Sequence, residues 1–283
     1  MSDVSGIDLH AHTDRSDGTF TPAELVKLAL SRDLSALGVT DHDTTDGLAD
    51  AERTAGGTGL EVVPGVELSA MHQGSSVHVL GYWMDRENRE LQTELRRLRE
   101  DRFRRGERMV EKLRALGHPI SFDRVREIAS GNNVVRPHVA QALVEAGVVE
   151  TEEDAFSGDL IGDGGLADVP KHALPPLEAM GLIEAAGGVC VLAHPGMWAG
   201  QRSVPEELIE AMAGRGMAGL EADHPDHTPE QCEHYRNLAR SLGLVATGSS
   251  DCHGTRYDPV RLGMVTTDPL QFAALRDRAA RVR

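Results

Sequence analysis

The stretch that decides the fold is IDLHAHTDRSDGTFTPAEL, residues 7–25. It begins with a short apolar run that ends in two histidines one residue apart, His10 and His12, and it continues through a turn that contains Asp17. The segment TPAE, residues 21–24, then places Thr, Pro and Glu at the spacing of a capped helix start. A strand that ends in metal-binding side chains and leads directly into a helix is typical of an α/β sheet.

Composition describes a globular protein with an acidic surface. The chain has 283 residues, 40% of them hydrophobic, and a formal net charge of −16, which is enough for one large domain that carries a smaller one. The negative charge argues against duplex nucleic acid as a partner, so an anionic substrate would need positive charge from metals or clustered arginines. Three widely spaced cysteines suit a reducing compartment. Because no segment resembles a signal peptide or a membrane span, we expect a cytoplasmic protein without a membrane partner.

Short apolar runs alternate with helical patterns along much of the chain. This alternation predicts a parallel sheet with an α/β fold. We favour a closed, TIM-like barrel over an open sheet, because the polar clusters follow the strands, where barrel active sites lie. The seven predicted strands cover residues 6–10, 35–40, 60–66, 76–82, 188–193, 219–222 and 244–248.

One long segment interrupts the alternation. Between residues 85 and 177 we find no convincing strand, and apolar residues recur at helical spacing. Further helix patterns cover residues 122–129 and 137–146. We therefore predict a barrel formed by residues 1–84 and 178–283, with a helical insertion at 85–177 as a second domain.

Nine residues near the ends of the predicted strands have the chemistry of metal ligands. In an extended segment, residues two apart point to the same side, so Asp251 and His253 can converge on one cavity while Cys252 points away. Taken singly, each histidine could be a packing residue and each acidic residue a cap or a turn, but their shared position favours a metal site. Imidazoles and carboxylates without a thiolate suit Mn²⁺, Fe²⁺ or Zn²⁺. The predicted ligands are His10, His12, Asp17, His42, Glu67, His78, His194, Asp251 and His253.

The motifs DLHAHTDRSDG, GVTDHD, PGVELS, VHVLGY, VLAHPG and GSSDCHG together resemble those of the polymerase and histidinol-phosphatase (PHP) superfamily of metal-dependent phosphoesterases. The resemblance spans the chain apart from the insertion. It implies a distorted seven-stranded (β/α) barrel, an insertion that caps the active site, and about two to three divalent ions. One ion would bind His10, His12, Glu67 and Asp251, a second Glu67, His78 and His194, and a third Asp17, His42 and His253.

The resemblance also implies a reaction. A metal-bridging hydroxide would attack phosphorus while the ions neutralise the phosphoryl oxygens. Asp rather than His at position 17 is similar to the branch that holds nucleotide phosphatases and small exoribonucleases. We therefore expect hydrolysis of a small nucleotide, such as a nucleoside 3′,5′-bisphosphate, or of the 5′ end of a short oligoribonucleotide. The catalytic candidates are Asp17, His42, Glu67, Asp251 and His227.

The insertion supplies most of the expected substrate contacts. Arg136 precedes Pro137 at a predicted helix start, where its guanidinium and the helix N–H groups could converge on an anion. The segment resembles the Arg-Pro-His element of PHP nucleotide phosphatases, which adds His138, and Lys171 matches a basic position of that branch. After the sixth strand, His227 is a further candidate for a phosphate contact or a general acid.

Several residues near these motifs have two plausible roles. Asp41 or Asp43 could orient ligand histidines or be plain loop residues. We expect His224 to be an ordinary loop residue. The arginine-rich run at 96–108 either reaches the phosphates of an oligonucleotide or, as we favour, forms a solvated, ion-paired helix face.

Three other functions remain open. A histidinol-phosphatase-like phosphomonoesterase is disfavoured by Asp17 and the insertion. An amidohydrolase-type C–N hydrolase commonly carries a bridging carbamylated lysine, whereas Glu67 is the expected bridge here. A non-catalytic metal-binding barrel would have lost ligands. Aromatic residues make up 4% of the chain, which leaves little material for a base-stacking platform.

Overall fold

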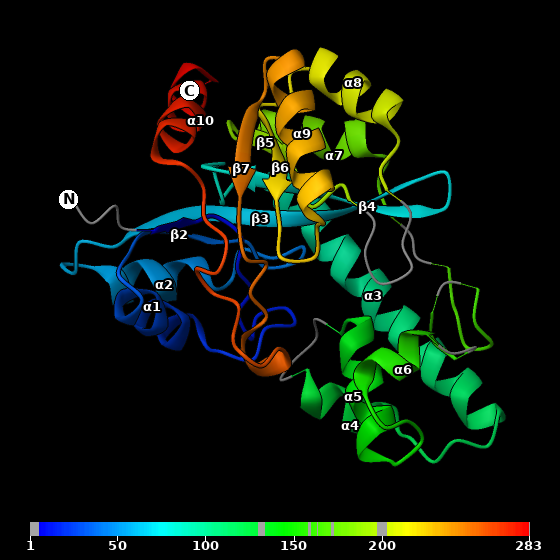
Figure 1. Ribbon diagram of the computed structural model, residues 1–283. Helices are drawn as coiled ribbons and strands as arrows, with labels where there is room; N and C mark the ends of the chain where they lie inside the picture. Colours follow the sequence, from blue (N-terminus) through cyan, green and yellow to red (C-terminus); the bar gives the residue numbers. More distant parts are fainter. Residues whose placement is uncertain are drawn as a thin grey trace.

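One mixed sheet organises the molecule. The computed structural model describes residues 6–129, 134–157, 160–162, 164–170, 173–196 and 203–282, and these contain a seven-stranded sheet whose spatial order equals the chain order (Figure 1). All seven predicted strands are confirmed. They are β1 (Gly6–Asp8), β2 (Leu34–Val39), β3 (Glu61–His72), β4 (Ser75–Tyr82), β5 (Val189–Leu192), β6 (Gly219–Asp223) and β7 (Val245–Gly248).

The prediction of an all-parallel sheet is wrong at β4, which pairs antiparallel with both β3 and β5. A two-residue turn, Gln73 and Gly74, joins β3 to β4, and its φ angles are 48° and 83°. Positive φ at both central residues is typical of the type I′ hairpin turn, which reverses the chain at once. Glu67 and His78 therefore lie inside strands that face each other, rather than after strand ends.

The predicted barrel is confirmed as a sheet that is nearly closed. Beyond the ends of β1 and β7, a bridge joins Ala11 to Cys252, and the His12 backbone N–H donates to the Cys252 carbonyl at 2.9 Å. The buried Asp8 carboxylate accepts hydrogen bonds from the backbone N–H and hydroxyl of Ser250 and from the N–H of Gly263. These contacts hold the two edge strands together.

Helices surround the strands. The predicted capping box at Thr21 and Glu24 is present, and a second one links Thr228 to Gln231. Figure 1 shows one pair, α1 and α2, beside β2 and β3, while α7, α9 and α10 lie near β4 to β7. Among the described residues no helix is both long and apolar enough to cross a membrane. The helices around the strands are α1 (Pro22–Ser31), α2 (Leu48–Ala55), α7 (Pro176–Ala185), α8 (Glu206–Gly214), α9 (Pro229–Ser241) and α10 (Pro269–Val282).

A helical group extends from one side of the barrel (Figure 1). Its first and longest helix belongs to two hydrophobic clusters: Leu91 and Leu95 pack into the barrel core, whereas Met109 and Leu113 pack with the other helices of the group. This helix therefore contributes residues to both clusters. The division of the chain at 85–177 into a separate domain stays a prediction. The group comprises α3 (Arg89–Ala115), α4 (Phe122–Ile128), α5 (Arg136–Glu145) and α6 (Glu152–Ser157).

Candidate active site

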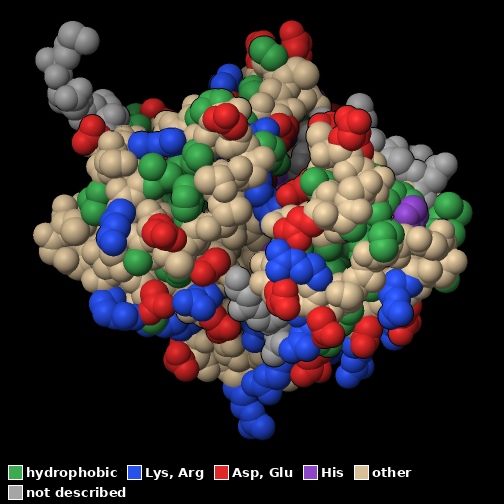
Figure 2. Space-filling view, turned by 90° about the horizontal axis from the view of Figure 1, so that it is seen from below, with side chains coloured by type: hydrophobic (Ala, Val, Ile, Leu, Met, Phe, Trp, Pro, Cys, Tyr) green, Lys and Arg blue, Asp and Glu red, His purple; other side chains and the backbone are tan. Residues whose placement is uncertain are grey.

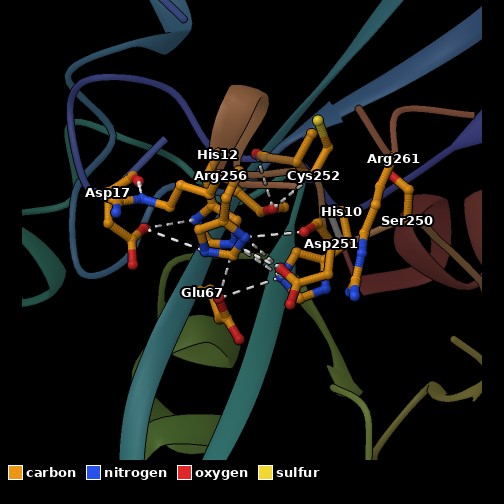
Figure 3. A network of polar contacts seen from close by, with 12 residues as sticks. His10, His12, Asp17, Glu67, Ser250, Asp251, Cys252, Arg256 and Arg261 are labelled. Carbon is orange, nitrogen blue, oxygen red and sulfur yellow. Dashed lines mark hydrogen bonds and ion pairs between the residues drawn. The ribbon is translucent and has the colours of Figure 1, made fainter. Parts of the chain in front are cut away.

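The first donor group joins the segment after β1 to β3 and to the segment after β7 (Figure 3). His10 Nε2 lies 3.2 Å and His12 Nε2 lies 3.1 Å from Glu67 Oε2. Asp251 Oδ1 lies 3.2 and 3.1 Å from the same two nitrogens. All four residues are buried, and they form one group that could hold a metal ion. The sulfur of Cys252 points away from these side chains, as the two-residue spacing predicts (Figure 3).

A second donor group lies beside the first and shares His12. Asp17 Oδ1 is 3.3 Å from His253 Nε2 and 3.7 Å from His12 Nδ1, and its Oδ2 is 3.9 Å from His42 Nε2. The ligand atoms of these four residues all lie within 4.8 Å of one another. Asp17, His42 and His253 are thus brought together as the sequence motifs imply.

The third donor group surrounds Glu67 from the other side. Its Oε1 lies 2.8 Å from His78 Nδ1 and 3.2 Å from His194 Nε2, while His42 Nδ1 is 3.1 Å from Oε2. The most compact donor set is Glu67, His78 and His42, and His194, the expected third member, also contacts Glu67. Glu67 therefore contacts histidines of all three groups.

The geometry of the three carboxylates fits bound cations. Asp17 Oδ1, Glu67 Oε2 and Asp251 Oδ1 are buried and accept no hydrogen bond from any residue that the structure describes, although imidazole nitrogens lie 3.1–3.3 Å away. Burial opposes ionisation, yet the adjacent histidines hold the pKa of each carboxyl well below its ordinary range. Ionised, buried oxygens that converge with imidazole nitrogens are the ligands that Mn²⁺, Fe²⁺ and Zn²⁺ prefer.

Comparisons with known proteins decide the family. Residues 8–130 match the family model for the PHP domain. A 3′,5′-nucleoside bisphosphate phosphatase from Chromobacterium violaceum is 34% identical over 252 residues, which cover 88% of both chains. The chain belongs to the PHP-domain family. A 5′-3′ exoribonuclease from Haemophilus influenzae is 31% identical over 87% of this chain and 89% of that protein.

A solved structure gives the same result for the PHP-domain fold. A protein from Bifidobacterium adolescentis, proposed to be a metal-dependent phosphoesterase, superimposes with a TM-score of 0.90 at 35% identity. The match covers 97% of this chain and 96% of that one. The chain is therefore a PHP-domain enzyme, a metal-dependent hydrolase of phosphoric esters.

Strained backbone marks this PHP-domain site. Asp43, His194 and Asp251 have φ angles of 51°, 23° and 47°, in the left-handed region that non-glycine residues seldom adopt. Such conformations cost free energy and persist where surrounding contacts enforce them. His194 and Asp251 are themselves predicted ligands, and Asp43 directly follows His42.

Glu221 of β6 contacts two histidines that are predicted ligands, and it was missed in the sequence. Its Oε1 lies 3.2 Å from His10 Nδ1, and its Oε2 accepts the backbone N–H of His194 at 2.8 Å. Burial opposes its charge, but His10 lowers the pKa of Glu221. A carboxylate that holds the second nitrogen of a ligand imidazole fixes its tautomer and its direction. The available signal was an acidic residue inside an apolar strand.

His224 lies in the loop after β6, as expected, but it also contacts a residue of the first donor group. The side chain is buried, because the segment after β6 folds back over the barrel end. Its Nδ1 accepts the Asp226 N–H at 3.1 Å, which leaves the proton of the neutral ring on Nε2. That nitrogen lies 3.5 Å from Asp251 Oδ2 and faces it.

Asp41 and Asp43 contact neighbouring chain segments rather than the imidazole rings of the predicted ligands. Asp41 accepts hydrogen bonds from the Thr13 N–H and hydroxyl and from the Ser16 hydroxyl at 2.6–2.8 Å. Asp43 contacts Arg102 at 2.5 Å and accepts the Ser69 N–H at 2.9 Å. Within the described ranges, neither carboxylate hydrogen-bonds a histidine directly, so any orienting effect passes through neighbouring residues.

His227 uses both ring nitrogens in backbone contacts. Nδ1 donates to the Ala222 carbonyl at 3.0 Å, and Nε2 accepts the Gly196 N–H at 3.0 Å. Burial lowers the pKa of His227. A catalytic or phosphate-binding role for this residue would require one of these hydrogen bonds to break.

The arginine-rich helix α3 divides into two faces, so neither sequence interpretation describes it fully. Arg97 forms an exposed pair with Glu94. Arg99 donates to the Asp43 carbonyl at 2.7 Å, and Arg102 contacts Asp43 and Ser69. The inward face therefore contacts the residue after His42 and strand β3, which carries Glu67.

Other cations border the site. Arg256 donates to the Asp17 carbonyl at 2.7 Å and pairs with Glu152 of α6 at 2.7 Å. Arg136, the first residue of α5, is half-buried, and its guanidinium lies 5.7 Å from the Phe156 ring centroid in the helical group. Burial, and then the charge of Arg136, lowers the pKa of Arg105 to about 10. Lys171 lies outside the described residues.

His138 is a buried neutral histidine near these cations. Its Nδ1 accepts the Val135 N–H at 3.2 Å, and burial lowers its pKa to about 4, helped by the charges of Arg256 and Arg102 and opposed by Asp17. On the face seen in Figure 2, Lys and Arg side chains are interspersed with acidic ones, and no broad basic field is visible.

Proposed function

We propose that this PHP-domain enzyme hydrolyses a phosphate ester of a small nucleotide, such as a nucleoside 3′,5′-bisphosphate, or of the 5′ end of a short oligoribonucleotide. One observation carries the proposal: three adjoining donor groups that contact Glu67 are bordered by guanidinium groups, in a chain whose net charge is −16. Local positive charge in an acidic protein suits a compact anion rather than a long polyanion. The activities for which the Chromobacterium and Haemophilus relatives are named support this choice.

The donor residues fit two to three divalent ions, on the three groups of ligand atoms. Such ions, as Mn²⁺, Fe²⁺ or Zn²⁺, would supply an activated water and positive charge for the phosphoryl oxygens. Glu221 and His224 keep the ligands His10 and Asp251 aligned. We assign the ligands as His10, His12, Glu67 and Asp251, then Glu67, His78 and His194, and then Asp17, His42 and His253.

The helical group would bind the phosphate that is not cleaved. Arg136 begins α5, so its guanidinium and the positive end of the helix dipole can approach the same anion. His138 carries its proton on Nε2, because Nδ1 accepts the Val135 N–H, and it can donate to a phosphate oxygen while neutral. Lys171 is assigned to this group on its sequence position.

The cysteines support a reducing, cytoplasmic location for this activity. Cys190, Cys232 and Cys252 are all free thiols, and two of them are buried. No disulfide is needed to hold the barrel, because the edge strands are joined by Asp8 and by the bridge at Ala11. A protein in this location would act on a small nucleotide of the cytoplasm.

The test is phosphate release by the purified, Mn²⁺-loaded protein. The substrates are adenosine 3′,5′-bisphosphate, AMP, histidinol phosphate and a short 5′-phosphorylated RNA. We expect release from the bisphosphate or the RNA, and we expect Asp251→Asn to reduce it at least 100-fold. Asp258→Asn, the same change at an exposed position seven residues later, is the matched control and should retain activity. Hydrolysis of histidinol phosphate alone, or of no phosphate ester, would refute the proposal.

A further inference from the structure

One aromatic ring lies on the loop that follows β7, which also provides Asp251 and His253. Tyr257 directly follows the short 3₁₀ helix Gly254–Arg256, and its side chain is half-buried. Its hydroxyl group makes no hydrogen bond within the part of the chain that the structure describes.

Arg261 fixes this ring from one face. Its guanidinium carbon lies 3.5 Å from the Tyr257 ring centroid, which is close contact for a cation over an aromatic ring. The guanidinium is held by two hydrogen bonds to the Asp226 carboxylate, at 2.8 and 2.9 Å. A bidentate pair of this kind restricts the plane of the guanidinium, and therefore of the ring that lies against it.

A chain of contacts links the ring to the metal centre. The Asp226 N–H donates to His224 Nδ1 at 3.1 Å, and His224 Nε2 lies 3.5 Å from Asp251 Oδ2. Figure 3 shows Arg261 beside Asp251. Burial and then the negative charge of Asp251 raise the pKa of Tyr257 to about 12, an effect that Arg261 opposes and that Asp226 and Asp17 add to.

The backbone separates this ring from the cations that border the site. Tyr257 has extended backbone angles, φ −119° and ψ 138°, and neighbouring residues of an extended segment point to opposite sides. Arg256 points to the Asp17 carbonyl and Glu152, whereas Tyr257 packs on Arg261. The Tyr257 ring and the Arg256 guanidinium therefore lie on different sides of this segment.

We propose that Tyr257, held by Arg261 and Asp226, stacks on the nucleobase of the substrate and gives this enzyme its preference for nucleotides. The inference rests on the proposed function and deepens it. Because every base offers a π-face, a stacking contact favours nucleotides over other phosphate esters without selecting one base. The low aromatic content of the chain is no obstacle, since a single fixed ring is enough for one base.

The first test compares a substrate with and without its base. The measurement is kcat/KM for adenosine 3′,5′-bisphosphate divided by kcat/KM for 1-deoxyribose 3,5-bisphosphate. We expect Tyr257→Leu to lower this ratio roughly tenfold, the size of one stacking contact, and Tyr257→Phe to keep it, because the ring remains. Phe272→Leu is the matched control, since Phe272 also lies under a guanidinium, that of Arg276, but on α10; it should leave the ratio unchanged.

A second test does not depend on turnover. Calorimetry would compare the affinities of the Mn²⁺-loaded protein for AMP and for ribose 5-phosphate, and we expect the parent to prefer AMP and Tyr257→Leu to lose that preference. If the parent hydrolyses neither bisphosphate, the proposed function fails, and this comparison alone decides the inference. Equal affinities in the parent, an unchanged ratio in Tyr257→Leu, or an equal loss in Tyr257→Phe would overturn stacking by Tyr257.

Discussion

At the scale of single residues, Glu221 should matter nearly as much as a ligand. Its carboxylate holds His10 Nδ1 and the His194 N–H at once. In Glu221→Gln one amide oxygen can still accept a hydrogen bond, but the charge that supports the His10 imidazole is lost. We expect roughly a 10- to 100-fold loss of metal affinity or activity, measured by metal titration and by phosphate release. Glu230→Gln, on the exposed start of α9, is the control. Equal metal affinity in parent and variant would show that Glu221 is dispensable.

His138 should give the protein a distinct pH dependence of stability. Its folded pKa is about 4, and a histidine in an unfolded chain titrates near 6.5. Because the folded value is the lower one, the unfolded chain binds the proton first, so the contribution is complete above about pH 6.5 and is lost between about pH 6.5 and 4. His138 is nearly fully buried, so solvent screens this effect little.

Urea unfolding of the parent and of His138→Gln measures the pH-dependent contribution of His138 to the unfolding free energy. From pH 7.5 to pH 5.0 the parent should lose roughly 2 kcal/mol more unfolding free energy than the variant, which has no group that titrates at this position. Loss of the Val135 contact lowers the stability of the variant at every pH and therefore cancels in the comparison. Parallel pH profiles would contradict a buried neutral histidine.

At the scale of elements, α3 joins the helical group to the metal centre through Arg102. The guanidinium contacts the fully buried Asp43 carboxylate, next to His42 in the chain. Arg102→Gln would leave that carboxylate buried without its partner, so we expect a loss of about 3 kcal/mol of unfolding free energy, together with reduced activity. Urea unfolding measures the loss.

Two variants make the Arg102 prediction specific. Adding Asp43→Asn to Arg102→Gln should recover part of the stability, because the unpaired charge is removed. Arg97→Gln, which breaks an exposed pair with Glu94 on the same helix, should change stability by no more than about 0.5 kcal/mol. Equal effects of Arg102→Gln and Arg97→Gln would exclude the coupling of α3 to the His42 segment.

At the scale of the whole molecule, divalent ions should stabilise the fold. Three buried carboxylates and six histidines gather at one end of the barrel, and ions that bind only the folded chain stabilise it by mass action, about 2.7 kcal/mol at 100 times the dissociation constant. We expect EDTA to lower the melting temperature by roughly 5 °C or more, and Mn²⁺ to restore it. Calorimetric scans with and without chelator test this, and coincident scans would count against metal binding.

The sequence and the structure agree most where the signal is local. Strands, capping boxes and the convergence of His10 and His12 on one carboxylate depend on spacings of one to four residues, and these predictions hold. The reversal of β4 also had a local signal, Gln73 and Gly74, but the alternation of strands and helices obscured it.

Other parts of the site depend on contacts between distant segments. Glu221 lies 211 positions from His10, and Arg256 lies 104 positions from Glu152. Side-chain spacing along one strand or helix carries no information about such pairs. For the same reason, His224 and Tyr257 gain a role only when the loops after β6 and β7 fold over the same end of the barrel.

The most direct test of the account is the metal content of the protein together with its activity. Parent and Glu67→Gln would be saturated with Mn²⁺, freed of excess metal, and measured by mass spectrometry of the metal and by phosphate release from adenosine 3′,5′-bisphosphate. Because Glu67 contacts histidines of all three donor groups, we predict at least two ions per chain and hydrolysis in the parent, with loss of both metal and activity in Glu67→Gln. Unchanged metal content in the variant, or a metal-loaded parent that releases no phosphate, would contradict the account.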